Sequence, residues 1–66
     1  MVVSMKAMRV NRELTQREVA KKLGVARETL QKWEAGKTYP TAPQLVALCN
    51  IYGCKMEDIF LPGTLA

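Results

Sequence analysis

The chain contains no histidine, a single serine (Ser4) and only two cysteines, Cys49 and Cys54. Without histidine, two thiols five residues apart cannot supply a four-ligand zinc site or a dense disulfide framework. The same inventory offers no acid, base and nucleophile for catalysis and no glycine-rich phosphate loop. We therefore expect a protein that is not an enzyme and has no metal or cofactor. Both cysteines are expected to be reduced, with Cys49 on a helix core face and Cys54 near a helix start.

Long apolar runs, a signal peptide and lipidation motifs are also missing, so we expect no membrane contact and a cytoplasmic location. No linker, internal repeat or low-complexity segment divides the 66 residues. A chain this small buries only about 60% of its unfolded surface and leaves no room for a cleft between subdomains. The prediction is one domain over 1–66, with a core at about 4–61 and a short C-terminal tail at 62–66.

The positive charge is concentrated in one half of the chain. The net charge is +4, and residues 1–39 hold nine of the ten Lys and Arg against four Glu, a local +5. Residues 40–66 carry Lys55, Glu57 and Asp58, a net −1. A basic half of this kind favours binding to nucleic-acid phosphates. The alternative is charge that serves solubility alone, because the excess is modest.

Two short helices are predicted within 15–36. Thr15 and Glu18 have the spacing of a capping box, so a helix begins at residue 16. Its apolar stripe ends at Leu23, and Gly24 follows where a left-handed residue closes a helix. After Gly24, only Val25 and Ala26 precede the next helix, which ends before Gly36. Helices this close must pack at a steep angle, as in a helix-turn-helix unit.

The second of these helices has one apolar and one polar face. At about 100° per residue, Leu30 and Trp33 share the inner face, while Glu28 and Lys32 point outward. This outer face fits entry into a DNA groove. An ordinary solvated helix surface is the alternative, and the spacing does not decide between the two.

Three further helices complete an all-α, compact five-helix bundle. Ser4 can cap a helix over 5–12, and Thr41 begins another that runs up to Gly53. A single-turn helix then follows, with three apolar residues directed inward: Met56, Ile59 and Phe60.

Arg9 lies on the inner side of the first helix, and Glu34 flanks the apolar stripe of the 27–35 region. We hypothesise that an Arg9–Glu34 ion pair fixes the angle of the helix that carries Glu34. The alternative is two independently solvated side chains, because exposed pairs contribute only about 0 to 1 kcal/mol.

The run from Met5 to Phe60 resembles the lambda-repressor-like helix-turn-helix family, the Cro and phage-repressor type also called the xenobiotic-response-element type. The residues that carry the resemblance are Leu14, Thr15, Gln16, Val19, Ala20, Leu23, Gly24, Val25, Trp33, Glu34, Gly36, Lys37, Pro40, Leu45, Leu48, Gly53, Met56, Ile59 and Phe60. The resemblance implies a five-helix bundle that binds double-stranded DNA in the major groove, usually as a two-fold dimer that regulates transcription. It also implies a bacterial or phage-encoded, nucleoid-associated protein.

The resemblance assigns DNA base contacts to Arg27, Glu28 and Lys32. The basic side chains can donate to guanine O6 and N7, whereas Glu28 can accept from cytosine N4 or can orient its neighbours instead. Gln16 matches a backbone-phosphate contact at a helix N-terminus. Further candidates for backbone contacts, the last two of them weaker, are Thr29, Gln31, Lys37, Thr38, Arg12 and Arg17.

Three positions depart from the usual family pattern. Ala26 stands where a Ser or Thr commonly caps the recognition helix, which costs about 1 kcal/mol. Glu13 occupies a turn position often held by glycine, and Lys55 replaces a usual Ser or Thr cap.

Two functions remain open. One is a sequence-specific DNA-binding repressor of the Cro or immunity-repressor type, which occupies a palindromic operator as a homodimer with recognition helices about 34 Å apart. The other is an antitoxin or antirepressor that mainly binds a protein partner. The apolar residues Phe60, Leu61 and Leu65 are candidates for a dimer or partner interface, with core packing as the alternative.

Overall fold

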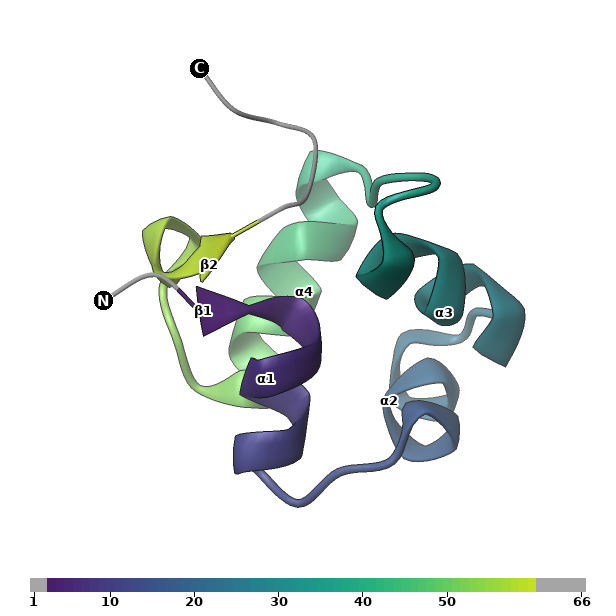
Figure 1. Ribbon diagram of the computed structural model, residues 1–66, viewed down its shortest axis with the longest axis horizontal. Coiled ribbons are helices and arrows are strands. Elements are labelled where there is room, and N and C mark those ends of the chain that lie inside the picture. Colours follow the sequence, from purple (N-terminus) through teal and green to yellow (C-terminus); the bar gives the residue numbers. More distant parts are fainter. Residues whose placement is uncertain (1–2, 61–66) are drawn as a thin grey trace.

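Four α-helices dominate the computed structural model, which describes residues 3–60 (Figure 1). The elements in chain order are β1 (Val3–Ser4), α1 (Met5–Asn11), α2 (Gln16–Leu23), α3 (Arg27–Ala35), α4 (Ala42–Tyr52), the 3-10 turn η1 (Met56–Asp58) and β2 (Ile59–Phe60). Helices α2 and α3 follow each other across a tight turn and form the predicted two-helix unit. Within residues 3–60, no helix has the length and apolar character needed to cross a membrane.

The helix boundaries follow from the local capping chemistry. The Ser4 hydroxyl accepts the Ala7 amide at 3.1 Å at the start of α1. Both capping boxes are formed, one by Thr15 with Glu18 and the other by Thr41 with Gln44. Gly24 ends α2 at φ 74°, in the left-handed region that suits glycine. The starts and ends predicted for these helices are confirmed to within one residue.

The predicted fifth helix is wrong. Residues 56–58 form only a 3-10 turn, in which the Asp58 amide donates to the Lys55 carbonyl at 3.0 Å. Ile59 is buried as expected, but Met56 is 43% exposed and does not enter the core. The described residues therefore hold four α-helices, one 3-10 turn and two short strands, because the chain becomes extended at Ile59 and pairs with a distant segment.

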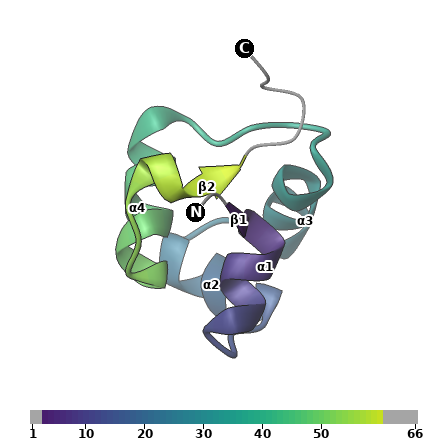
Figure 2. The same ribbon diagram turned by 60° about the vertical axis from the view of Figure 1, so that its left-hand side comes forward.

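That pairing joins the two ends of the described chain. Strands β1 and β2 run parallel, with Val3 opposite Ile59 and Ser4 opposite Phe60. Figures 1 and 2 show them side by side at the edge of the helical bundle. Two-residue strands are too short to show an alternating pattern, so the sequence analysis contained no sign of this pairing.

One core connects all the helices. Met5 and Met8 of α1 contribute to it, and β2 adds Ile59. The remaining fully buried members come from α2, α3 and α4: Val19, Leu30, Trp33, Leu48, Cys49 and Tyr52. The core position predicted for Cys49 is confirmed, and Cys54 is half-buried just before η1. The helices are thus held around shared apolar side chains. Figure 2 shows the arrangement of the four helices from a second direction.

The turn between α1 and α2 contains Glu13 at φ 57°. Among residues 3–60, Glu13 is the one residue other than glycine with a positive φ. A side chain in the left-handed region costs about 1–2 kcal/mol, so glycine would be less strained than Glu13 at this position.

Candidate nucleic-acid interface

Helix α3 presents a charged face to solvent and buries the opposite one. Leu30 is 0% and Trp33 is 2% exposed, so these two side chains dock the helix on the core. Arg27, Glu28 and Lys32 are all exposed. The orientation predicted for α3 is therefore the one observed, and the three side chains assigned to base contacts are accessible together.

The N-terminus of α3 has no side-chain cap. Ala26 occupies the capping position with extended backbone angles and offers no oxygen to the free amides of the first turn. The Ala26 carbonyl accepts the Thr29 and Leu30 amides at 3.0 and 3.4 Å, which are the first bonds of the helix itself. The position of α3 therefore depends on its contacts with the rest of the protein.

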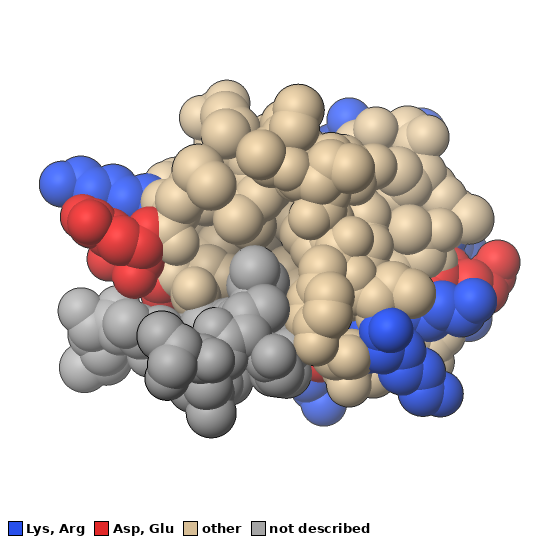
Figure 3. Space-filling model, turned by 90° about the horizontal axis from the view of Figure 1, so that it is seen from above, with Lys and Arg blue, Asp and Glu red and all other residues tan. Residues whose placement is uncertain are grey.

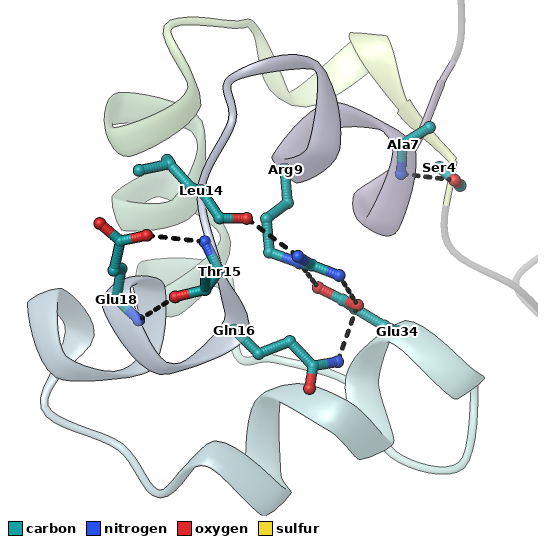
Figure 4. A network of polar contacts seen from close by, with 8 residues as sticks. All are labelled: Ser4, Ala7, Arg9, Leu14, Thr15, Gln16, Glu18 and Glu34. Carbon is teal, nitrogen blue, oxygen red and sulfur yellow. Dashed lines mark hydrogen bonds and ion pairs between the residues drawn. The ribbon is translucent and has the colours of Figure 1, made fainter.

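The polar contact among these is an ion pair between α1 and α3 (Figure 4). Arg9 Nε and Nη2 donate to the two Glu34 carboxylate oxygens at 2.8 and 3.2 Å. The side chains are only 12% and 4% exposed, so this pair is better shielded from water than the exposed pairs considered in the sequence analysis. The hydrogen bond to Glu34 raises the pKa of Arg9 above its ordinary value. Arg9 Nη1 also donates to the Leu14 carbonyl at 2.9 Å, which ties the α1–α2 turn to the same site.

Helix α2 joins this network through Gln16. Its Nε2 donates to Glu34 Oε1 at 3.1 Å, so the Glu34 carboxylate accepts hydrogen bonds from both α1 and α2. Figure 4 shows Arg9 and Gln16 converging on Glu34. The sequence analysis assigned Gln16 only a phosphate contact and missed this bond, because a hydrogen bond between residues 18 positions apart has no local signal.

A hollow of about 450 Å³ opens beside the N-terminus of α2. Three arginines line it, Arg9, Arg17 and Arg27, together with Thr15, Gln16 and Leu14. We call this feature the basic hollow. It combines positive side chains with the positive end of a helix, which are the two elements of an anion-binding site. The same hollow is thus lined by Arg17, which was assigned a contact with the DNA backbone, and by Arg27, which was assigned a contact with DNA bases.

A second hollow, of about 260 Å³, shares Gln16 with the basic hollow. It is lined by Lys6, Gln16, Gln31, Glu34 and Ala35. Lys6 was not among the predicted site residues. It precedes Arg9 by three positions, so a helical-wheel comparison of the two would have placed both on one side of α1.

The remaining candidates for backbone contacts fall into two groups. Gln31, Lys37 and Thr38 are exposed along α3 and the turn that follows it, and Thr29 is half-buried. Arg12 is different, because its Nε donates to the Tyr52 carbonyl at 2.6 Å, at the C-terminal end of α4. The structure therefore gives Arg12 a bond that stabilises the bundle, and a DNA contact from it stays a prediction.

Charge is unevenly distributed over the surface. Figure 3 shows a face made mostly of uncharged residues, with Lys and Arg gathered at its edge on the side where α2 and α3 lie in Figure 1. This surface does not test the prediction that Phe60, Leu61 and Leu65 form a dimer interface. Leu61 and Leu65 lie outside the described residues, as does the predicted tail, and only the backbone of Phe60 is described.

Comparison with known proteins gives a consistent result. A model of the helix-turn-helix family matches residues 5–59. An uncharacterized HTH-type transcriptional regulator of Methanocaldococcus jannaschii is 40% identical over 57 residues, which is 86% of each chain. An uncharacterized HTH-type transcriptional regulator of Archaeoglobus fulgidus is 38% identical over 56 residues, covering 85% of this chain and 79% of the relative.

A third relative is much longer than this chain. It is the HTH-type transcriptional activator BcrR of Enterococcus faecalis, which is 31% identical over 52 residues. The match covers 79% of this chain but only 26% of the relative. The similarity is therefore confined to one part of that activator.

Proposed function

This chain belongs to the lambda-repressor-like helix-turn-helix family of DNA-binding transcriptional regulators, and we propose that it reads a specific duplex sequence by placing α3 in the major groove. The observation that carries the proposal is the exposed, polar face of a helix whose opposite face is anchored by Leu30 and Trp33. A rigidly docked helix with long polar side chains is what base-edge recognition requires.

Three side chains of this face supply the readout. Arg27 and Lys32 donate to guanine O6 and N7. Glu28 either accepts from cytosine N4 or holds one of the two basic side chains in position. The proposed base-reading set is therefore selective for G·C pairs at two or three positions of each half-site.

The basic hollow is the proposed site for one backbone phosphate. Arg17 supplies positive charge, and the α2 N-terminus supplies the helix dipole. The exposed residues of the α3–α4 turn, Lys37 and Thr38, would contact a second phosphate. These contacts set the register of α3 without reading sequence.

We propose a Cro-like mode of action, in which a homodimer on a palindromic operator covers an overlapping promoter. The two recognition helices would be about 34 Å apart, which is one turn of DNA. One relative is named an activator, so a promoter-fusion assay is needed to determine the sign of regulation. A fall in reporter output when the chain is expressed supports repression, and a rise contradicts it.

The decisive experiment is selection from random duplexes, followed by titration of the selected site against salt. We expect enrichment of a palindrome and a steep linear fall of log affinity with log salt. Lys32→Ala should relax the preference at one base pair, whereas Arg17→Ala should weaken binding on all duplexes and lower the salt slope by about 1. Gln16→Ala, expected from the sequence to act on all duplexes alike, is less informative because it also removes the bond to Glu34.

Lys55→Ala is the matched control, because it removes the same charge just before η1, which leads directly into β2. Figure 1 shows β2 on the side of the molecule away from α3. If Lys55→Ala weakens binding as much as Arg17→Ala, the interface is misplaced. If no duplex is enriched, the result favours the alternative function, an antitoxin or antirepressor that binds a protein partner.

A further inference from the structure

The C-terminus of α4 brings the two cysteines together. Gly53 is left-handed at φ 68°, and the Cys54 amide donates to the Cys49 carbonyl at 3.0 Å. This bond spans six residues and is the defining bond of a Schellman motif. In such a motif the residues at the two ends of the bond usually make a side-chain contact, and here both of them are cysteines.

The geometry suits a covalent link. A carbonyl oxygen lies about 2.4 Å from its own Cα, so a 3.0 Å bond between these residues keeps their Cα atoms less than about 7 Å apart. Disulfides need Cα atoms at about 4.4–6.8 Å. Both thiols are free, and Cys54 packs against the core cluster that contains Cys49. The two sulfur atoms therefore share one small region beneath the Gly53 turn.

We propose that Cys49 and Cys54 form a reversible intramolecular disulfide when hydrogen peroxide oxidises the protein. In the first step the Cys54 thiolate attacks the peroxide, which gives a sulfenic acid on Cys54 and releases water after protonation. In the second step the Cys49 sulfur displaces the sulfenic hydroxyl, which leaves as a second molecule of water. Two thiols and one peroxide thus give one disulfide and two waters, and each sulfur loses one electron.

The environments of the two thiols set this order. Cys49 is 5% exposed, whereas Cys54 is half-buried and so is the thiol that a peroxide reaches. Burial, followed by contact with the Cys54 thiol, raises the pKa of Cys49 to about 11, which keeps Cys49 protonated until Cys54 has reacted. The reaction is expected to take between seconds and hours, depending on the oxidant concentration, as disulfide formation commonly does.

The cross-link would fix the turn between α4 and η1. Helix α4 contacts η1 directly, and β2 follows η1 without a break. The disulfide would therefore hold the segment that leads into β2, while α3 and the basic hollow lie elsewhere in the fold. Oxidation is expected to raise the melting temperature and to leave DNA affinity unchanged, because none of the proposed DNA contacts involves a cysteine.

The test treats the reduced full chain with hydrogen peroxide, then unfolds it, alkylates free thiols and weighs the intact protein. We expect a loss of about 2 Da, no alkylation, and restoration of two alkylated thiols by dithiothreitol. Cys54→Ser should retain one alkylated thiol and show no such loss. The proposal is overturned if the oxidised wild type still alkylates at both cysteines, or if the disulfide joins two copies of the chain.

Discussion

Helices α2 and α3 lie next to each other in the chain, but different kinds of contact hold them. Helix α2 has a complete capping box, with hydrogen bonds of 2.9 and 3.1 Å between Thr15 and Glu18. These bonds also lower the pKa of Glu18, led by the one from the Thr15 backbone amide. Helix α3 has no side-chain cap, and is anchored by Leu30, Trp33 and Glu34.

The helix proposed to read DNA is thus held by distant parts of the chain. The apolar side chains that anchor α3 lie in the core shared with α1 and α4. Its polar anchor, Glu34, accepts hydrogen bonds from Arg9 of α1 and Gln16 of α2. Substitutions far from the charged face should therefore alter binding. Local substitutions within α2 should mostly alter stability.

The largest expected effect comes from removing an apolar anchor of α3. Leu30→Ala leaves a cavity in the core and should lower the free energy of unfolding by about 2–5 kcal/mol. Leu23→Ala, at the half-buried end of α2, is the matched control and should cost clearly less. Thermal or urea unfolding followed by circular dichroism measures both. Equal losses would mean that the two helices are anchored alike.

The second effect comes from the polar anchor. Arg9→Ala leaves the Glu34 carboxylate shielded from water but without its positively charged partner. The substitution should therefore lower the free energy of unfolding by about 3 kcal/mol. It should also weaken DNA binding by more than one phosphate contact, because α3 is no longer held at its angle. Fluorescence anisotropy on the selected duplex measures this, at a temperature where the variant is folded.

A double variant serves as the control for the ion pair. Arg9→Met combined with Glu34→Leu removes both charges, and should be more stable than Arg9→Ala. Affinity and stability both equal to wild type in Arg9→Ala would rule out a positioning role for the pair.

The third effect tests the caps directly and has opposite signs in the two helices. Thr15→Ala removes an existing cap and should cost about 1 kcal/mol, while Ala26→Ser supplies the missing one and should gain about as much. Chemical unfolding of both variants in parallel measures the difference. If Ala26→Ser gains nothing, the first turn of α3 already has its amides satisfied.

An effect of similar size at neutral pH concerns Tyr52, which is fully buried in α4 and whose hydroxyl has no partner within residues 3–60. Tyr52→Phe removes an unsatisfied group and should stabilise the protein by about 1 kcal/mol. A less stable Phe variant at pH 7 would show that the hydroxyl has a partner after all.

The effect of Tyr52→Phe should grow with pH. Burial, and then the nearby charge of Glu34, raise the pKa of Tyr52 to about 12. The unfolded chain releases this proton near pH 10, so the wild type loses stability between about pH 10 and 12 and the Phe variant avoids that loss. Urea unfolding of both proteins across this range measures the divergence.

Sequence reasoning succeeded where the structure depends on neighbours in the chain. Capping residues, left-handed glycines and apolar spacing gave the bounds of α2, α3 and α4, since each signal lies within one or two turns of the residue that it explains. The inward side of α3 followed from the positions of Leu30 and Trp33 alone.

The same reasoning failed where the structure depends on distant pairs. The pairing of Val3 with Ile59 turned the expected fifth helix into a 3-10 turn and a strand, although Met56 and Ile59 have helical spacing. The Gln16–Glu34 bond was likewise missed. The base and phosphate contacts at α3 stay predictions, because accessibility alone does not show what a side chain touches.

Strands β1 and β2 have a practical consequence for engineering. Because they run side by side in the same direction, the chain enters and leaves the described fold at one edge, with Ser4 opposite Phe60. A tandem of two copies on one polypeptide would need a linker only as long as the gap between the copies, with no extra length to cross either domain. In such a covalent tandem the two copies could carry different substitutions, so that each half-site of the operator would be bound by a different variant.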